Sequence, residues 1–170
     1  FRMPLHPHMS PDALGNFVLV GDVGSGKSTL IKALLGLDGD VTKTQALDFH
    51  RNNIVDSPGE FVSRRFLYGA LLNTITRVDT IVYLQSADNR QLCMPGDLLR
   101  LYPGKRVVGV VSKVDVPGAD ADAAERLLQR EGIHGPYFRI SRAEPASFER
   151  LREHLARIHR EQRGAGQPTQ

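Results

Sequence analysis

The sequence has few of the features that mark a secreted, membrane-spanning or strongly charged protein. Its single cysteine, Cys93, excludes an internal disulfide and is typical of a reducing cytosol. Lys and Arg number 22 against 19 Asp and Glu, an excess too small for a strongly cationic nucleic-acid-binding module. No apolar run approaches the ~20 residues that cross a bilayer, and no apolar segment follows residues 1–4 to form a secretory signal. We therefore expect a cytoplasmic protein with neither a membrane nor a nucleic-acid partner.

The composition that is present is that of one ordinary globular domain. The chain has 170 residues, of which 41% are hydrophobic and 24% charged, and this excludes a disordered polypeptide. Residues 1–16 carry three prolines and little periodicity, which predicts a flexible N-terminal arm. Its His6 and His8 could bind a metal, although a solvated tail is the favoured interpretation. We predict one domain over residues 17–162 and a disordered C-terminal tail over 163–170.

The hydrophobic pattern predicts strands and helices that alternate along the chain. The predicted strands are 17–20, 46–50, 53–56, 80–84, 106–111 and 137–140, and the predicted helices are 27–35, 66–75, 119–130 and 145–160. Such alternation indicates an α/β fold of three layers, with a mostly parallel central sheet flanked by helices. The last helix carries several arginines, for which a solvated face is favoured over docking to a partner: Arg150, Arg152, Arg157 and Arg160.

A phosphate-binding loop is predicted between the first strand and the first helix. Residues 21–28 read G-D-V-G-S-G-K-S, which fits the pattern G-x-x-x-x-G-K-[ST]. Glycines let such a loop wrap a β-phosphate with successive backbone N–H groups pointing inward. Lys27 would reach the β- and γ-oxygens, and Ser28 would offer its hydroxyl to Mg²⁺. The residues assigned to phosphate binding are Gly21, Asp22, Val23, Gly24, Ser25, Gly26, Lys27, Ser28 and Thr29.

Two further segments are predicted to surround the γ-phosphate and its metal ion. Asp56 ends a predicted strand and begins the sequence D-S-P-G, so its carboxylate can hold Mg²⁺ through water while the Gly59 N–H faces the phosphate. Mg²⁺ prefers six oxygen ligands. A mobile threonine between the two motifs could supply one of them and make a switch. From the residues alone, Thr42 and Thr44 are equal candidates.

A base-binding site is predicted from residues 112–115, S-K-V-D, which follow the strand at 106–111. The Asp115 carboxylate can accept hydrogen bonds from the N1–H and the exocyclic amine of guanine, a pair of donors that adenine does not present. The stem of Lys113 can lie along the base. Ser141 and Arg142 follow the last predicted strand and are candidates for the loop that closes over the base. GTP or GDP is the expected ligand, with ATP as the alternative.

In this order, these elements resemble the small-GTPase superfamily and, within it, the EutP/PduV family associated with bacterial microcompartments for ethanolamine and propanediol utilisation. The resemblance covers residues 17–158 and includes K-T-Q-A at 43–46, D-S-P-G-E-F at 56–61 and M-P-G-D-L-L at 94–99. It implies a small-GTPase-like P-loop NTPase fold and gives the switch role to Thr44 rather than Thr42. It also implies a cytosolic accessory protein whose protein partner would be the microcompartment shell or another component. Related proteins have been assigned an acetate kinase activity.

Two positions depart from the general GTPase pattern. Ser112 stands where most GTPases have an asparagine that ties down the base loop and meets guanine N7, so base affinity is expected to be lower by about 1 kcal/mol. Glu60 stands where fast hydrolysers often have a glutamine that orients the attacking water. An ionised carboxylate only accepts hydrogen bonds and would lie near an anionic phosphate. We therefore expect slow hydrolysis.

The function expected from the sequence is a Mg²⁺-dependent GTP-binding switch whose surface changes at residues 37–50 and 57–66. The residues expected to act in hydrolysis are Lys27, Thr44, Gly59 and Glu60. The alternative is an ATP-dependent phosphotransferase such as an acetate kinase. It would need a site for the acceptor carboxylate, which Arg51, Arg64 or Arg65 could provide, although a solvated role is favoured for each.

Overall fold

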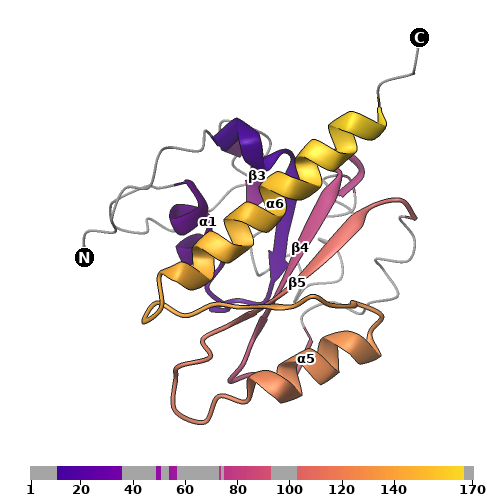
Figure 1. The fold of residues 1–170 in the computed structure, drawn as a ribbon. Helices are drawn as coiled ribbons and strands as arrows, with labels where there is room; N and C mark the ends of the chain where they lie inside the picture. Colours follow the sequence, from indigo (N-terminus) through magenta and orange to yellow (C-terminus); the bar gives the residue numbers. More distant parts are fainter. Residues whose placement is uncertain are drawn as a thin grey trace.

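The computed structural model describes residues 11–35, 49–50, 54–56, 73, 75–92 and 103–166, which form a sheet with helices on both faces (Figure 1). The six strands lie in the order β2-β3-β1-β4-β5-β6. They are β1 (Phe17–Gly21), β2 (Phe49–His50), β3 (Ile54–Asp56), β4 (Thr80–Ser86), β5 (Arg106–Ser112) and β6 (Phe138–Arg139). The helices whose bounds are described are the 3-10 turn η1 (Pro11–Leu14), α1 (Lys27–Leu35), α5 (Ala121–Arg130) and α6 (Ala146–Ala165). The predicted α/β sheet architecture is confirmed.

The strand β1 lies at the centre of this sheet. It pairs in parallel with β3 from Phe17↔Ile54 to Leu19↔Asp56, and with β4 along its whole length. The next pairs, β4 with β5 and β5 with β6, are parallel as well, whereas β2 runs antiparallel to β3. Every residue of β1 and β4 is buried, which explains why both read as continuous apolar runs rather than as an alternating pattern.

The core lies in two halves, one on each face of the sheet. On one face, α1 and α6 pack side by side against alternate strand residues (Figure 1), and this half includes Phe17, Leu19, Leu30, Val82, Leu151 and Leu155. On the other face, α5 covers the remaining strand residues, and this half includes Val18, Val20, Ile75, Tyr83, Ala124 and Leu128. The period of two in each strand therefore divides its side chains between the two helical layers.

The ends of two helices differ from the sequence prediction. Helix α5 begins at Ala121 rather than 119, because the Asp120 side chain accepts a hydrogen bond from the Ala123 N–H at 2.9 Å and so caps the helix. Helix α6 continues to Ala165, into the segment predicted as a tail. An i,i+4 ion pair from Arg157 to Glu161, at 2.9 Å, supports this last part. Within the described residues, no helix is both long and apolar enough to cross a membrane.

The segment predicted as an arm, residues 1–16, ends in a part that belongs to the core. The turn η1 contacts α6, and Leu14 is only 4% exposed. The next residue, Gly15, has a φ of +69°, and a Cβ there would lie 2.4 Å from the His159 ring, so the chain approaches α6 too closely for a side chain. Residues 11–16 therefore pack on the domain, and residues 1–10 lie outside the described part.

The prediction of a solvated arginine face on α6 is wrong for one of its four residues. The side chain of Arg152 is only 15% exposed, and its Nη2 donates to the carbonyls of Ala33 at 2.6 Å and Leu34 at 2.7 Å. These carbonyls end α1 and lack partners within that helix, so the guanidinium of α6 caps α1. Arg150, Arg157 and Arg160 are exposed as predicted.

Replacing Leu151 by alanine tests the half of the core that α6 covers. Leu151 is 0% exposed, so Leu151→Ala should lower the free energy of unfolding by about 2–5 kcal/mol through lost burial and a cavity. The control is its neighbour Arg150→Ala, whose side chain is 55% exposed and whose loss should change stability by less than about 0.5 kcal/mol. Urea denaturation of the three proteins measures both. Equal losses would contradict the packing described.

Candidate nucleotide-binding site

The predicted site segments lie at one edge of the sheet because the strands that precede them are parallel. The phosphate-binding loop follows β1, Ser112 ends β5, and Ser141 comes just after β6. Asp56 ends β3 opposite Leu19 of β1. The strands that follow β1 in the sequence, β2 and β3, lie on one side of it, and the later strands β4, β5 and β6 lie on the other. The strand order therefore reverses at β1, and α/β sheets bind ligands at the carboxyl ends of the strands at such a point.

The phosphate-binding loop has an open, concave backbone. Gly24 and Gly26 have φ values of 74° and 97°, in the left-handed region that favours glycine. A Cβ at either position would meet no atom of the described residues within 4 Å. The loop is closed by a hydrogen bond from the Ser25 N–H to the Asp22 carbonyl at 3.1 Å. This backbone fits a phosphate group, which needs a cradle of N–H groups without side chains in the way.

Lys27 lies across this loop rather than projecting into solvent. The residue is 8% exposed, and its Nζ donates to the carbonyls of Gly21 at 2.8 Å and Asp22 at 2.7 Å. A Cβ on Gly21 would lie 2.7 Å from the Ser25 Oγ and 2.9 Å from the Leu84 carbonyl, so the start of the loop has no room for a side chain. The ammonium group is therefore held in place beside the loop by two backbone carbonyls.

Ser112 connects the predicted base loop to the phosphate-binding loop. It is 4% exposed, and its hydroxyl donates to the Ser25 carbonyl at 2.6 Å. A serine hydroxyl has a single hydrogen to donate, so this bond uses the only donor that the side chain has. The serine thus supplies the connection between loops that we expected from an asparagine, and it has no further donor for guanine N7.

Beyond Ser112 the chain turns so that Asp115 is exposed. Lys113 has a φ of 55°, in the left-handed region, and the Val116 N–H donates to the Lys113 carbonyl at 3.3 Å, which closes the turn. Left-handed conformations of non-glycine residues cost energy and gather at functional sites. The Asp115 carboxylate is accessible to a ligand, as the base-binding prediction requires.

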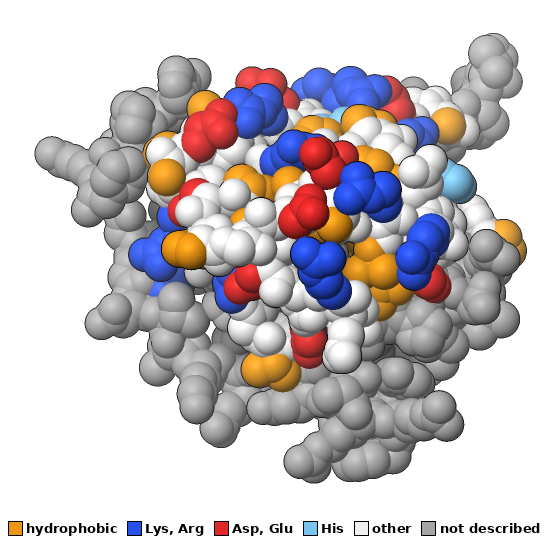
Figure 2. Space-filling view, turned by 90° about the horizontal axis from the view of Figure 1, so that it is seen from below, with side chains coloured by type: hydrophobic (Ala, Val, Ile, Leu, Met, Phe, Trp, Pro, Cys, Tyr) orange, Lys and Arg blue, Asp and Glu red, His pale blue; other side chains and the backbone are white. Residues whose placement is uncertain are grey.

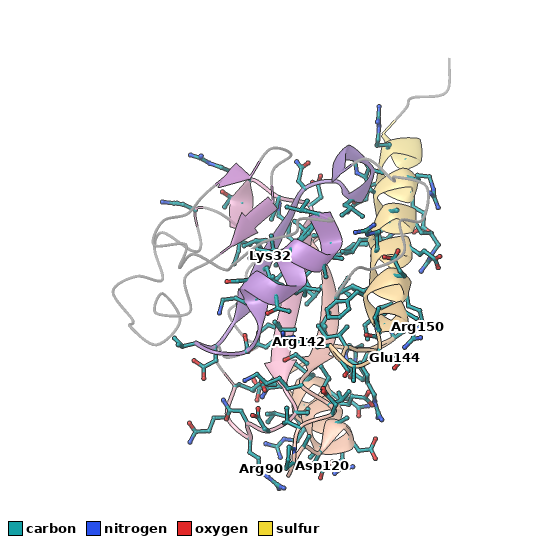
Figure 3. All side chains as sticks on the ribbon, turned by 90° about the vertical axis from the view of Figure 1, so that its left-hand side faces the viewer. Lys32, Arg90, Asp120, Arg142, Glu144 and Arg150 are labelled. Carbon is teal, nitrogen blue, oxygen red and sulfur yellow. The ribbon has the colours of Figure 1, made fainter. Side chains whose placement is uncertain are left out.

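The Ser141 side chain shapes its own loop. Ser141 is 6% exposed; its Oγ accepts from the Ala143 N–H at 3.0 Å, and its own N–H donates to the Ser147 Oγ at 3.1 Å. Arg142 is exposed, and in Figure 3 it lies near the middle of the molecule, below Lys32 and above Asp120. Within this loop, Arg142 is therefore accessible to a bound base, whereas Ser141 is buried and its hydroxyl contacts the loop backbone.

An ion-pair cluster ties the strand before this loop to α5. Arg139 of β6 donates from Nε to Glu125 at 2.7 Å and from Nη2 to Asp122. The hydrogen bonds with Glu125 and then Asp122 raise the pKa of Arg139 above its usual value. The three side chains are partly exposed, so the cluster orients β6 against α5 more than it stabilises the fold.

Part of the predicted metal and catalytic set lies outside the described residues. These residues are Thr42, Thr44, Gly59 and Glu60, together with the arginines at 51, 64 and 65, the histidines at 6 and 8, and the stretch 94–99. For Asp56 the backbone position at the end of β3 is described. Ser28, in the first turn of α1, is partly buried and adjoins the loop. Where the chain is described, no three acidic, histidine or cysteine side chains gather as a metal site.

The sequence analysis missed the segment after β4. Gln85, at the end of β4, donates hydrogen bonds to the carbonyls of Ser86 and Asn89. The Asn89 side chain donates in turn to Asp22 of the phosphate-binding loop. The signal was a polar run directly after a buried strand, at the same edge as the other loops. It was overlooked because it matches no nucleotide-binding motif.

The surface around this edge carries charges of both signs. Figure 2 views the molecule from below, the side to which the β1 arrow points in Figure 1, and it shows Lys and Arg interspersed with Asp and Glu. Attraction of an anionic ligand over a long distance needs a surface of one sign. Recognition at this edge therefore depends on the local loop contacts.

A loop of this sequence between β1 and α1 of such a sheet defines the P-loop NTPase fold. The G-domain of FeoB from Methanococcus jannaschii has a similar structure, with a TM-score of 0.59 and 21% sequence identity, covering 84% of this chain and 95% of that one.

The sequence profile of the PduV-EutP family, described as ethanolamine utilisation and propanediol utilisation, matches residues 14–157. The chain belongs to this family. It is 37% identical over 150 residues to the "Probable acetate kinase EutP" of Salmonella typhimurium, covering 88% of this chain and 94% of that protein. The corresponding protein of Escherichia coli is 36% identical over the same shares. The "Propanediol utilization protein PduV" of Citrobacter freundii is 32% identical, with 71% of this chain and 80% of that protein covered.

The bond from Ser112 to Ser25 predicts that Ser112 acts on the phosphate-binding loop more than on the base. Ser112→Ala would leave the Ser25 carbonyl buried without this donor, at a cost of about 1–3 kcal/mol of stability. We expect the affinities for GDP and ADP to fall by the same factor, about tenfold. Titration calorimetry on both ligands measures this. A change in the ratio of the two affinities, without a loss for ADP, would instead assign Ser112 to base recognition.

Proposed function

We propose that the protein is a Mg²⁺-dependent guanine-nucleotide-binding switch that hydrolyses GTP slowly. The observation that carries the proposal is the buried hydrogen bond between Ser112 and Ser25, which fixes the predicted base loop against the phosphate-binding loop. In this proposal, Lys27 and Asp115 would act at the two ends of one nucleotide site. A purine nucleoside triphosphate has the matching layout, with a base at one end and phosphates at the other.

Asp115 supports guanine as the base. Its carboxylate is exposed after β5, in a turn whose left-handed Lys113 sets the direction of the chain. A carboxylate only accepts hydrogen bonds, and guanine presents two donors on one edge whereas adenine presents one. N7 is an acceptor in both guanine and adenine, so the preference for guanine rests on Asp115.

The phosphate-binding loop supports a di- or triphosphate with Mg²⁺. The open backbone at Gly24 and Gly26 would take the β-phosphate, and Lys27 would neutralise its charge. Ser28, with the predicted ligands Thr44 and Asp56, would hold the metal ion. When bound, the ion neutralises charge on the phosphate oxygens.

Glu60 is the reason for proposing slow hydrolysis. It follows Gly59 in the sequence, would lie beside the attacking water in this proposal, and offers only acceptors when ionised. A slow reaction suits a switch, because the triphosphate-bound surface persists until a partner acts. We propose residues 37–50 and 57–66 as the segments that change between the two nucleotide states.

The family suggests where such a switch would act. Its description names ethanolamine and propanediol utilisation, so we propose a cytoplasmic accessory role at a bacterial microcompartment. The proposed partner is a shell protein or another component of that compartment.

A second candidate function comes from the relatives named "Probable acetate kinase", of which the chain covers 94%. In that reaction the γ-phosphoryl group of ATP would pass to a carboxylate oxygen of acetate, giving acetyl phosphate and ADP. Arg51, Arg64 and Arg65 are the candidates for binding the acetate carboxylate. Formation of acetyl phosphate by the purified protein would favour this candidate over the switch.

Replacing Asp115 by asparagine tests the proposed base specificity. Asp115→Asn presents a donor where guanine also has a donor, so GTP affinity should fall about 10- to 100-fold. Xanthosine triphosphate has a carbonyl in place of the exocyclic amine, and its relative affinity should rise. Competition binding with both nucleotides measures the preference. An unchanged preference would contradict guanine recognition and favour the kinase.

Replacing Glu60 by glutamine tests the slow-hydrolysis proposal. Glu60→Gln removes a negative charge near the γ-phosphate and offers both a donor and an acceptor to the attacking water. We expect a modest rise in single-turnover GTP hydrolysis at saturating Mg²⁺. A large fall would show that Glu60 is a productive catalytic group, and the slow switch would have to give way to an enzyme that uses this carboxylate.

A further inference from the structure

The loop after β4, residues 87–92, is fixed between the base side and the phosphate side of the site. The Ala87 N–H donates to the Ser112 carbonyl at 2.9 Å, and the Asp120 N–H donates to the Ala87 carbonyl at 2.9 Å. One end of the loop is therefore attached both to the end of β5 and to the cap of α5. This attachment places the remainder of the loop next to the start of the phosphate-binding loop.

Gln85, a buried residue of β4, holds this loop in place through hydrogen bonds to its backbone. It is 2% exposed, and its amide nitrogen donates to the carbonyls of Ser86 at 3.2 Å, Asn89 at 2.8 Å and Gln91 at 3.3 Å. A buried amide is costly unless it is hydrogen-bonded, so these contacts and the loop conformation support each other. The backbone of Asn89 is thus fixed by a residue of the central sheet.

The side chain of Asn89 connects this fixed loop to the phosphate-binding loop. Its Oδ1 accepts from the Gln91 N–H at 2.9 Å, and its Nδ2 donates to the Asp22 Oδ2 at 3.3 Å. The other Asp22 oxygen, Oδ1, accepts from the Val23 N–H at 2.8 Å. The Asp22 carbonyl accepts from the Lys27 Nζ at 2.7 Å. Asp22 is therefore the residue at which Asn89, the loop backbone and Lys27 meet.

We propose that Asn89 is a positioning residue of the phosphate-binding loop, which it acts on through Asp22. With one carboxylate oxygen on Asn89 and the other on the Val23 N–H, the Asp22 side chain has one orientation, and its carbonyl stays directed at Lys27. The donor on Asn89 also offsets a negative charge that lies in a loop built for an anion. This inference deepens the proposed function and rests on it, since it takes the loop as the binder of nucleotide phosphates.

The variant Asn89→Asp isolates the contact with Asp22. Aspartate keeps the shape of the side chain and the oxygen that accepts from the Gln91 N–H, but it replaces the donor with an oxygen that repels the Asp22 carboxylate. We expect GDP affinity to fall about tenfold. The affinity for GMP, which lacks the β-phosphate, should change little. The measured quantity is the ratio of GDP to GMP affinity, by titration calorimetry with Mg²⁺, and a general loss of structure would not lower that ratio selectively.

The double variant Asp22→Asn/Asn89→Asp should restore the ratio. The new amide at position 22 keeps an oxygen for the Val23 N–H and gains a donor for the new carboxylate at position 89, so both hydrogen bonds re-form with reversed polarity. Recovery to within about threefold of the wild-type ratio is expected. A merely structural role for Asn89 predicts no such rescue.

Arg90→Ala provides the matched control. Arg90 is exposed in the same loop and lies at the lowest end of the view in Figure 3. Its loss should leave the GDP to GMP ratio unchanged. The unfolding midpoint of each variant is measured as well, and we expect all of them to remain close to that of the wild type.

The outcomes separate this inference from the proposed function. An unchanged ratio in Asn89→Asp, in a protein that binds GDP, overturns the inference and leaves the proposed function standing. A protein that prefers ADP overturns the guanine proposal, and the ratio of ADP to AMP then decides the role of Asn89 by the same criterion. A wild-type protein that binds neither diphosphate overturns both.

Discussion

The hydrogen bond from the Ser112 hydroxyl to the Ser25 carbonyl joins two loops that lie 87 residues apart in the sequence. It forms because β5 and β1 are both parallel to β4 and so end at the same edge of the sheet. Almost every other feature of the site depends on this arrangement. The Asp115 turn begins at Ser112, and Lys27 is held by the carbonyls at the start of the loop that contains Ser25.

An asparagine at position 112 could both connect the two loops and donate to guanine N7, whereas a serine has one donor and can do only one of these. Its single donor connects the loops, so the proposed base recognition would depend on Asp115 and Arg142. The loop after β4 adds support from the opposite side, since Gln85 orders Asn89 and Asn89 contacts Asp22. The phosphate-binding loop is thus held by hydrogen bonds both from the segment after β4 and from the end of β5.

The features that depend on neighbouring residues in the sequence could be predicted from it. The phosphate-binding loop has a fixed spacing, and β1 and β4 read as apolar runs because both of their faces are buried. Contacts between distant segments left no such signal. Arg152 looks like one more solvated arginine until α1 and α6 pack together, and Leu14 looks like part of a tail until α6 covers it. The contact of Asn89 with Asp22 depends on the strand order, which brings these two distant residues together.

The proposed preference for guanine nucleotides is tested most directly by titration calorimetry with Mg²⁺. GTP and ATP binding are compared on one preparation of the wild-type protein. An exposed carboxylate at Asp115 that reads the guanine edge predicts GTP to bind more tightly, by about tenfold or more. ATP binding as tight as GTP binding, or tighter, would contradict the guanine-nucleotide switch. In that case, transfer of phosphate to acetate would be the activity to measure on the same sample.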